Sequence, residues 1–289
     1  MGRITIVVGI DGSEQSRRTV RWAAAEARIH AAPLKILTAY PWNGPSEALH
    51  GVGELPELVA QRFEQLAATT AAETRAQQPG IEVTGTAVIG DPAQALLEAG
   101  RTAAMLVVGN RGRGGFASLV LGSVSQHVAT HATGPVVVVR GRADAGSGPI
   151  AVGADGSASA QRALALGFDE AQRRGCGLLA VLSYPPPPYG MDVPPLPCDR
   201  DAAWRDAASD LDAAVTPWRE KYPTVPVKTL TEPGSPAKTL VDVSRDATLL
   251  IVGNRGHGAL AGSLLGSVSQ QLLHHADCPV MIVHADQAP

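Results

Sequence analysis

Glycine and serine residues recur along this chain at a spacing that is typical of an anion-binding loop. Gly109 and Gly112 are followed, after nine residues, by Gly122 and Ser123, between an apolar run and an amphipathic stretch. A strand, a glycine-rich loop and a helix N-terminus place free backbone N–H groups and the positive end of the helix dipole around a phosphate. The motif therefore predicts a phosphate site.

The same motif returns 144 positions later, at Gly253, Gly256, Gly266 and Ser267. Other landmarks repeat with the same offset: Asp11-Gly12-Ser13 as Asp155-Gly156-Ser157, Gly90-x-Pro92-Ala93 as Gly234-x-Pro236-Ala237, and Gly134-Pro135 as Cys278-Pro279. A constant offset predicts two complete tandem copies rather than a short-period repeat, and each is long enough to bury its own core. The predicted boundaries are 1–141 for the first domain, 142–148 for a flexible linker and 149–289 for the second domain.

Apolar runs alternate with helical patterns in each copy. In the first copy we expect strands at 4–10, 34–40, 81–88, 105–108 and 135–140, and helices at 14–31, 57–77, 92–102 and 124–133. The second copy repeats this order from 150 to 283, with a third strand, 225–230, that Glu232 and Pro233 are expected to keep short. Apolar strands separated by helices predict a parallel sheet covered on both faces. We therefore predict an α/β fold of two tandem domains, each a Rossmann-like, doubly wound, five-stranded parallel sheet.

In such sheets ligands bind beyond the carboxyl ends of the strands, where the strand order reverses. Asp11 ends the first strand, Tyr40 ends the second, and the glycine motif follows the fourth. We expect Gly109 and Gly112 to adopt positive φ and to let the backbone approach a ligand, and Ser123 to cap its helix. Asp11 has an alternative role as a turn and helix-capping residue, which is compatible with binding.

Composition excludes several classes of function. Lys and Arg number 24 against 27 Asp and Glu, so the formal charge of −3 offers no basic field to a nucleic acid, and nucleic acid is not an expected partner. No apolar run approaches the roughly 18 to 20 residues that span a bilayer, so no membrane segment is expected. Three cysteines, all in the second copy and without a C-x-x-C pair, fit a reducing cytosol and predict a cytoplasmic protein.

Four basic side chains lie in or beside the glycine segments: Arg111, Arg113, Arg255 and His257. Each either screens phosphate charge or is a loop charge in contact with solvent. His127 and His131 stand at i, i+4, a spacing that zinc sites use, but the second copy has Gln271 and His275 there and no third ligand is evident. We therefore predict no metal site built from protein side chains.

Taken together, these residues resemble the ATP-binding branch of the universal stress protein family, over nearly the whole chain and in two tandem domains. The signature G-2x-G-9x-G-S/T occurs in both copies, with V-G-x-D-G-S at the first strand, G-x-P-A before the third helix and S-V-S-Q after the glycines. The resemblance implies strand order 3-2-1-4-5 and ATP as the ligand, with Mg²⁺ held on the phosphates in some members.

The resemblance also implies a role for each matching residue. Asp11 and Asp155 would hold the adenine and ribose, with backbone groups around Tyr40 and Tyr184. Gly109 and Gly253 would lie against the ribose. Backbone N–H groups would bind the phosphates at Gly112, Gly122, Ser123 and Val124, and at Gly256, Gly266, Ser267 and Val268.

The fifth strand of each domain is apolar and would lie at a sheet edge, which invites pairing. In the family this strand commonly pairs domains, so we expect the two domains of the chain to pair like a linked dimer; a homodimer of chains is a further alternative. The segments 41–56 and 185–197 are expected to act as lids or as partner-reading surfaces, and the protein partner is not identified by the sequence.

The leading interpretation is a cytoplasmic, ATP-binding tandem universal stress protein that couples nucleotide occupancy to a stress response through conformation or partners. No catalytic residue is predicted, because there is no Walker A motif and no lysine in the phosphate loop, so at most slow ATP hydrolysis is expected. The alternatives are an adenine-nucleotide hydrolase or transferase of related fold, whose phosphate loop after the first strand is missing here, and a structural interaction module without nucleotide.

Overall fold

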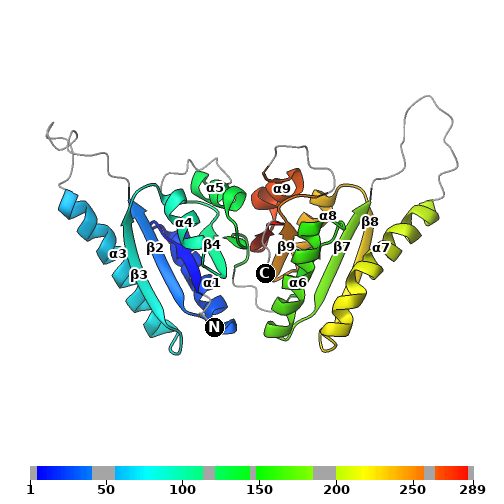
Figure 1. Ribbon diagram of the computed structural model, residues 1–289, viewed down its shortest axis with the longest axis horizontal. Helices are drawn as coiled ribbons and strands as arrows, with labels where there is room; N and C mark the ends of the chain where they lie inside the picture. The colour runs from blue at the N-terminus through cyan, green and yellow to red at the C-terminus, as the bar shows by residue number, and fades with distance from the viewer. Residues whose placement is uncertain are drawn as a thin grey trace, which may run out of the picture. The chain divides into compact units, whose positions relative to one another are not determined.

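The computed structural model describes residues 5–40, 56–112, 121–143, 148–184, 200–256 and 264–285. The chain divides into two compact units, of which the first reaches Val139 and the second begins at Arg140 (Figure 1). Arg113, His257 and nearly all of the two expected lid loops lie outside the described residues, so the predictions made for them stay predictions.

The first unit, unit 1, alternates strands and helices along the chain. Its elements are β1 (Ile6–Gly9), α1 (Glu14–Ile29), β2 (Leu34–Tyr40), α3 (Pro56–Gln77), β3 (Val83–Ile89), α4 (Pro92–Gly100), β4 (Met105–Gly109), α5 (Ser123–His131) and β5 (Val136–Val139). Each predicted element is present, and its ends lie within two residues of the predicted ones. The hydrophobic pattern is therefore sufficient to place these strands and helices.

The second unit, unit 2, repeats this order. Its elements are β6 (Ile150–Gly153), α6 (Ala158–Arg174), β7 (Leu178–Tyr184), α7 (Arg200–Lys221), β8 (Val227–Pro233), α8 (Pro236–Val243), β9 (Leu249–Gly253), α9 (Ser267–His275) and β10 (Val280–Val283). Every strand begins and ends 144 positions after its counterpart in unit 1, so the repeat in sequence is a repeat in structure.

The expectation of a short third strand in unit 2 is wrong. β8 has seven residues, as β3 has, and its last residue, Pro233, is in register with Tyr184 of β7. β8 comes last in the strand order of its unit. A proline is tolerated in an outermost strand because its missing N–H need not belong to the ladder.

The strands of each unit form a parallel sheet. The order is β3-β2-β1-β4-β5 in unit 1 and β8-β7-β6-β9-β10 in unit 2, which confirms the predicted doubly wound α/β fold. β1 lies between β2 and β4, with Val8 in register with Ile36 on one side and Val107 on the other. The strands that follow β1 in the chain lie on one side of it up to β3 and on the other side from β4 onward. This change in strand order leaves a crevice at the carboxyl ends of the strands.

Helices cover both faces of each sheet (Figure 1). In unit 1, α1 contacts α3 on one face and α4 contacts α5 on the other. The central strands are buried between these layers, and all four residues from Met105 to Val108 of β4 are core residues. Within the part of the chain that the structure describes, no helix combines the length and the apolar character needed to cross a membrane.

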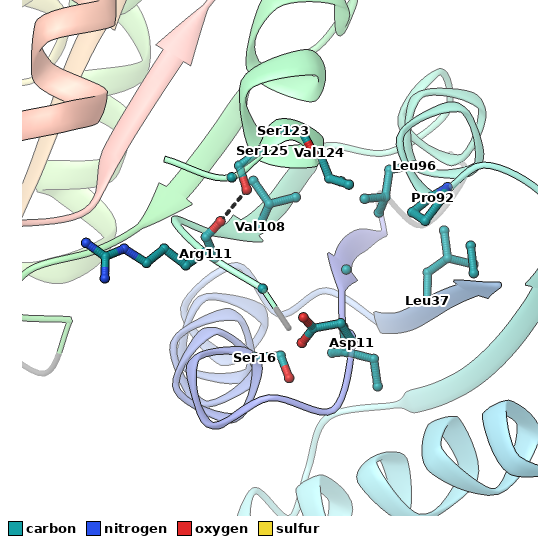
Figure 2. A pocket seen from close by; sticks show the side chains of 16 residues that line it. Asp11, Ser16, Leu37, Pro92, Leu96, Val108, Arg111, Ser123, Val124 and Ser125 are labelled. Atoms are coloured by element: carbon teal, nitrogen blue, oxygen red, sulfur yellow. Dashed lines mark hydrogen bonds between the residues drawn. The ribbon is translucent and has the colours of Figure 1, made fainter. Parts of the chain in front are cut away.

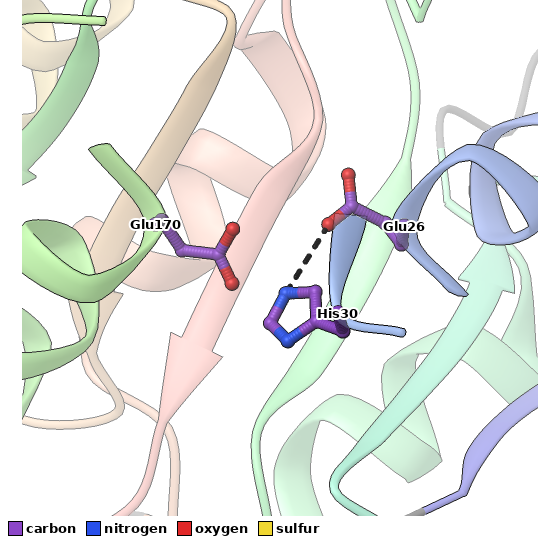
Figure 3. Close-up of side chains that lie close together, drawn as sticks. All are labelled: Glu26, His30 and Glu170. Atoms are coloured by element: carbon purple, nitrogen blue, oxygen red, sulfur yellow. Dashed lines mark ion pairs between the residues drawn. The ribbon is translucent and has the colours of Figure 1, made fainter. Parts of the chain in front are cut away.

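Two buried glutamates occupy equivalent positions on the first helix of each unit. Glu26 of α1 is 1% exposed, and its Oε2 lies 3.7 Å from Nε2 of His30, one turn later (Figure 3). The equivalent Glu170 of α6 lies 3.1 Å from Nη2 of Arg174. Side chains at i, i+4 meet on a helix surface, so each buried acid has a basic neighbour on its own helix. The buried acid is glutamate in both units, whereas its basic neighbour is a histidine in unit 1 and an arginine in unit 2.

Candidate functional site

A cavity of about 410 Å³ lies at the carboxyl edge of the sheet of unit 1 (Figure 2). Its walls come from the ends of β1, β2 and β4 and from the first turns of α4 and α5. Six residues of the predicted site line it: Asp11, Gly109, Gly112, Gly122, Ser123 and Val124. Segments that are far apart in the sequence therefore meet where the strand order reverses.

Unit 2 has a cavity at the equivalent place, with a volume of about 760 Å³. All seven residues predicted for this copy line it: Asp155, Tyr184, Gly253, Gly256, Gly266, Ser267 and Val268. The two cavities share their construction but differ in size.

Tyr40 is the predicted site residue that the structure does not bring to a cavity. Its side chain is 5% exposed and stacks on Phe63 of α3, with ring centroids 5.0 Å apart. Its carbonyl oxygen accepts a hydrogen bond of 2.9 Å from the Gly90 N–H. At the end of β2 it is Ala39, one residue earlier, that lines the cavity.

Asp11 closes a turn at the edge of the cavity. Its Oδ1 accepts a hydrogen bond of 2.9 Å from the Ser13 N–H, and Asp155 of unit 2 makes the same bond to Ser157 at 3.0 Å. The helix cap itself is Ser13, whose side chain accepts from the Ser16 N–H. The turn role and a place in the cavity wall therefore coexist, since the aspartate backbone bends here while its carboxylate lines the crevice.

The expectation of positive φ at Gly109 and Gly112 is wrong. Positive φ occurs instead at Gly12, at 79°, and at Gly156, at 80°. A Cβ at Gly109 would lie 2.9 Å from Thr19 Oγ1, and a Cβ at Gly112 would lie 2.5 Å from Asp11 Oδ2. Close packing of the glycine segment against α1 and the aspartate, rather than backbone conformation, requires glycine at these two positions.

The first turn of α5 opens on the cavity without a side-chain cap. Gly122 is the N-cap residue, with φ −78° and ψ 151°, and Ser123 is the first helical residue, so the prediction that Ser123 caps the helix is wrong. Gly266 is the uncapped N-cap residue of α9 in the same way. By contrast, the Asp91 side chain caps α4 by accepting from the Gln94 N–H at 2.9 Å. The first N–H groups of α5 and α9 thus have no cap from a side chain and are suited to an anion.

Two hydrogen bonds fix the start of α5 against the end of β4. The Ser125 hydroxyl donates to the Gly109 carbonyl at 2.5 Å (Figure 2). The Gly122 N–H donates to the Asn110 carbonyl at 2.8 Å. In unit 2 the Ser269 hydroxyl donates to the Gly253 carbonyl at 2.8 Å. The serine two residues after each motif therefore positions the helix start, a role the sequence analysis did not assign.

The arginine of each glycine segment lies at the rim of its cavity. Arg111 and Arg255 both line the cavities and are exposed. Figure 2 shows the Arg111 guanidinium on the far side of its backbone from Asp11, directed away from the cavity. In this arrangement the Arg111 charge is solvated, which is one of its two predicted alternatives.

Apolar side chains complete the wall of the unit 1 cavity, and the sequence analysis did not assign them to the site. They are Ile10, Leu37, Pro92, Leu96 and Val108. Their pattern is that of ordinary core residues of strands and amphipathic helices, so no sequence signal separates them from the core. The cavity consequently joins an apolar wall to an uncapped helix terminus, and it suits a ligand with a flat apolar part and an anionic part.

Comparison with known proteins gives one consistent family. The universal stress protein family matches residues 3–140 and again residues 147–284. A universal stress protein of Mycolicibacterium smegmatis is 35% identical over 287 residues, covering 96% of each chain. A universal stress protein of Mycobacterium tuberculosis is 34% identical over 288 residues, also covering 96% of each chain.

A solved structure shares the fold over the whole length. The crystal structure of a universal stress protein from Archaeoglobus fulgidus superposes with a TM-score of 0.70 at 20% identity, covering 97% of this chain and 98% of that one. The tandem arrangement of two such units is therefore found in a protein of distant sequence.

Proposed function

The chain belongs to the universal stress protein family, and we propose that each of its two units binds one adenine nucleotide, ATP, so that occupancy changes conformation or partner binding in a stress response. The proposed regulator acts in the cytoplasm, and its protein partner is a component of that response. Pairing of the two domains, and of two chains, stays a prediction.

One observation carries the proposal: the same uncapped helix terminus faces an aspartate across a cavity in both units. In unit 1 the terminus is at Gly122 and the acid is Asp11; in unit 2 they are Gly266 and Asp155. Free N–H groups at a helix start bind phosphate, and a carboxylate accepts hydrogen bonds from ribose hydroxyls. A nucleotide uses both features together, the N–H groups for its phosphates and the carboxylate for its ribose.

The proposed orientation gives each part of the nucleotide one end of the unit 1 cavity. The triphosphate would lie at the start of α5, where the N–H groups of Ser123 and Val124 come first in the helix. The adenine would lie toward the end of β2, against the apolar side chains of Leu37 and Leu96. This orientation places the negative charge at the positive end of the helix dipole.

A divalent cation fits the same arrangement without a dedicated set of protein ligands. Mg²⁺ keeps several waters and is commonly held by nucleotide phosphates with one or two carboxylates. Asp11 and Asp155 are the carboxylates nearest to the glycine segments, because a Cβ at Gly112 or Gly256 would touch them. Mg²⁺, when bound, would neutralise phosphate charge.

A regulator is favoured over an enzyme of related fold. The described residues that line the unit 1 cavity include no lysine and no histidine, and their one carboxylate, Asp11, accepts a hydrogen bond from the Ser13 N–H. Slow ATP hydrolysis would therefore proceed without a dedicated catalytic side chain.

The direct test is to denature the purified protein and count the adenine nucleotide released per chain, before and after incubation with ATP and Mg²⁺. Two nucleotides per chain are expected. A chain that carries none and takes up no added ATP would contradict the proposal and would favour a structural interaction module.

Gly122→Val and Gly266→Val test the phosphate end of each cavity. A Cβ at Gly122 would lie 3.6 Å from the Asn110 carbonyl oxygen, an ordinary contact, so the helix start can accept a side chain that would fill the phosphate position. Each variant is expected to bind one nucleotide per chain instead of two. Gln126→Val is the matched control, because Gln126 is exposed on the first turn of the same helix and does not line the cavity.

A further inference from the structure

The cavity of unit 2 extends to a place that the cavity of unit 1 does not reach. Six of its lining residues have equivalents, 144 positions earlier, that do not line the first cavity. Leu265 and Gln270 lie near the start of α9, and the other four lie on β7 and α7: Leu182, Tyr184, Ala207 and Asp210, equivalent to Thr38, Tyr40, Phe63 and Leu66. Ala207 and Asp210 belong to α7, which covers β7 and β8. We call this extension, bordered by Tyr184, Ala207 and Asp210, the α7 compartment.

A single large-to-small difference accounts for the opening. In unit 1, Phe63 stacks on Tyr40 and buries it. In unit 2 the position of Phe63 is held by Ala207, whose methyl group leaves the space of a phenyl ring empty. Tyr184 is consequently half-buried and lines the cavity, whereas Tyr40 is buried and does not.

The α7 compartment lies at the end of the cavity away from the phosphate position. In the sheet of unit 2 the order is β9, β6, β7, β8, and the uncapped start of α9 follows β9. Asp155 follows β6, in the middle, and α7 covers β7 and β8 on the other side. A nucleotide with its phosphates at α9 therefore directs its base toward Tyr184 and Ala207.

This region carries a carboxylate, which accepts hydrogen bonds, and hydroxyl groups, which both donate and accept them. The carboxylate of Asp210 is exposed, and the Ser183 hydroxyl oxygen is buried without a hydrogen-bond partner among the described residues. The equivalents in unit 1, Leu66 and Ala39, have neither group. The Asp210 carboxylate repels a second phosphate and attracts a cation, so a basic group suits this compartment.

An exposed tryptophan stands next to the compartment on α7. Trp204 is 50% exposed and lies three residues before Ala207, on the same side of the helix. Its equivalent in unit 1 is Ala60. Trp204 offers an apolar surface for a linker and an intrinsic fluorescence signal for binding in unit 2.

We propose that the α7 compartment lets unit 2 accept an adenine nucleotide that carries an extended basic group on its base, whereas unit 1 accepts the unsubstituted nucleotide alone. This inference rests on the proposed nucleotide function of both units. Phe63 closes the unit 1 cavity at the base end, Ala207 opens the unit 2 cavity, and Asp210 receives the positive charge.

The test uses N6-(6-aminohexyl)-ATP, whose ammonium group extends from the adenine, with ATP as the reference and N6-hexyl-ATP as the uncharged control. We expect ATP to bind at two sites per chain and both substituted nucleotides at one, measured by titration calorimetry and by intrinsic tryptophan fluorescence of the parent and of Trp204→Phe. Failure of ATP itself to bind would overturn the proposed function; binding of ATP at two sites with equal binding of the aminohexyl compound at both would overturn this inference alone.

Two variants separate shape from charge. Ala207→Phe, which restores the residue of unit 1, is expected to abolish the single site for both substituted nucleotides and to keep two sites for ATP, which also shows that the variant is folded. Asp210→Asn replaces an exposed side chain by one of similar shape. It is expected to lower the affinity for the aminohexyl compound by about fivefold, the upper range for exposed ion pairs, and to leave the affinity for N6-hexyl-ATP unchanged. An Asp210→Asn variant that binds the aminohexyl compound like the parent would contradict the role of the carboxylate.

Discussion

The packing of α3 on β3 differs from that of α7 on β8, although the two pairs occupy equivalent places in their units. In unit 1, a Cβ at Gly85 of β3 would lie 2.7 Å from the carbonyl carbon of Ala67, so strand and helix meet backbone to backbone. In unit 2 the equivalent residues are Thr229 and Leu211, which have larger side chains, and α7 contacts β8 less extensively than α3 contacts β3. Small residues in unit 1 thus permit an approach that larger residues in unit 2 prevent.

The same two helices border the cavities. Phe63 of α3 stacks on Tyr40, and the cavity of unit 1 is about 410 Å³; α7 presents Ala207 instead, and the cavity of unit 2 is about 760 Å³. The glycine motif is the same in both. Residues outside the motif therefore account for the difference in cavity size, while the motif gives both cavities the same uncapped helix terminus.

The largest effect is expected for Gly85→Thr, which gives unit 1 the residue of unit 2. The new side chain would collide with the α3 backbone and should lower the free energy of unfolding by about 3 kcal/mol, as severe overpacking does. Urea unfolding would measure the loss, and Thr229→Ala in unit 2, with a loss below about 1 kcal/mol, is the matched control. Equal losses in the two variants would contradict the difference in helix approach.

Phe63→Ala is the next test, because it gives unit 1 the small residue of unit 2. Loss of the stacked, half-buried ring should cost about 2 kcal/mol of unfolding free energy. The same variant should bind N6-hexyl-ATP at two sites per chain instead of one. One site in a folded variant would show that α3 itself, rather than Phe63, closes the cavity.

Cys278 gives unit 2 a pH dependence that unit 1, with Gly134 at the equivalent position, does not share. Burial raises the pKa of the Cys278 thiol to about 12, above the value of about 8.5 for an unfolded cysteine. The unfolded chain therefore loses this proton first, and stability falls as the pH rises between these two values. The loss from this thiol should be about 1.4 kcal/mol per pH unit above pH 9.

The measurement compares denaturant unfolding of the parent and of Cys278→Ala at pH 8, 9 and 10. The variant should lose less stability between pH 9 and pH 10 than the parent does. Parallel pH profiles would show that Cys278 ionises alike in the folded and unfolded chain.

The smallest effect is expected at the helix starts that the two units share. Gly122→Ser would supply the missing side-chain cap of α5 and should raise the free energy of unfolding of the free protein by about 0.3 kcal/mol. The added hydroxyl would compete for the N–H groups proposed to bind phosphate, so ATP affinity should fall in the same variant. Thermal unfolding with and without ATP measures both; a rise in both stability and affinity would contradict the role of the uncapped terminus.

Prediction from sequence succeeded where the signal was periodic or repeated. The strands and helices are apolar or amphipathic runs, and the offset of 144 positions located the second copy. These signals were sufficient to predict the fold class and the edge of each sheet at which the cavity lies. It failed for Gly109 and Gly112, because the need for glycine there comes from Thr19 and Asp11, which approach only after folding. It failed for the length of β8, because local proline chemistry says nothing of whether a strand is central or outermost.

The sequence by itself determined two copies of a parallel α/β unit and most of the motif residues that line the two cavities, since hydrophobic period, glycine spacing and the topological switch point are properties of the chain order. The tertiary structure decided that Ser125 rather than Ser123 positions the helix start, that Tyr40 is covered while Tyr184 is open, and that the two cavities differ in size. These depend on how closely a helix approaches a strand, and that distance is set by pairs of side chains far apart in the sequence.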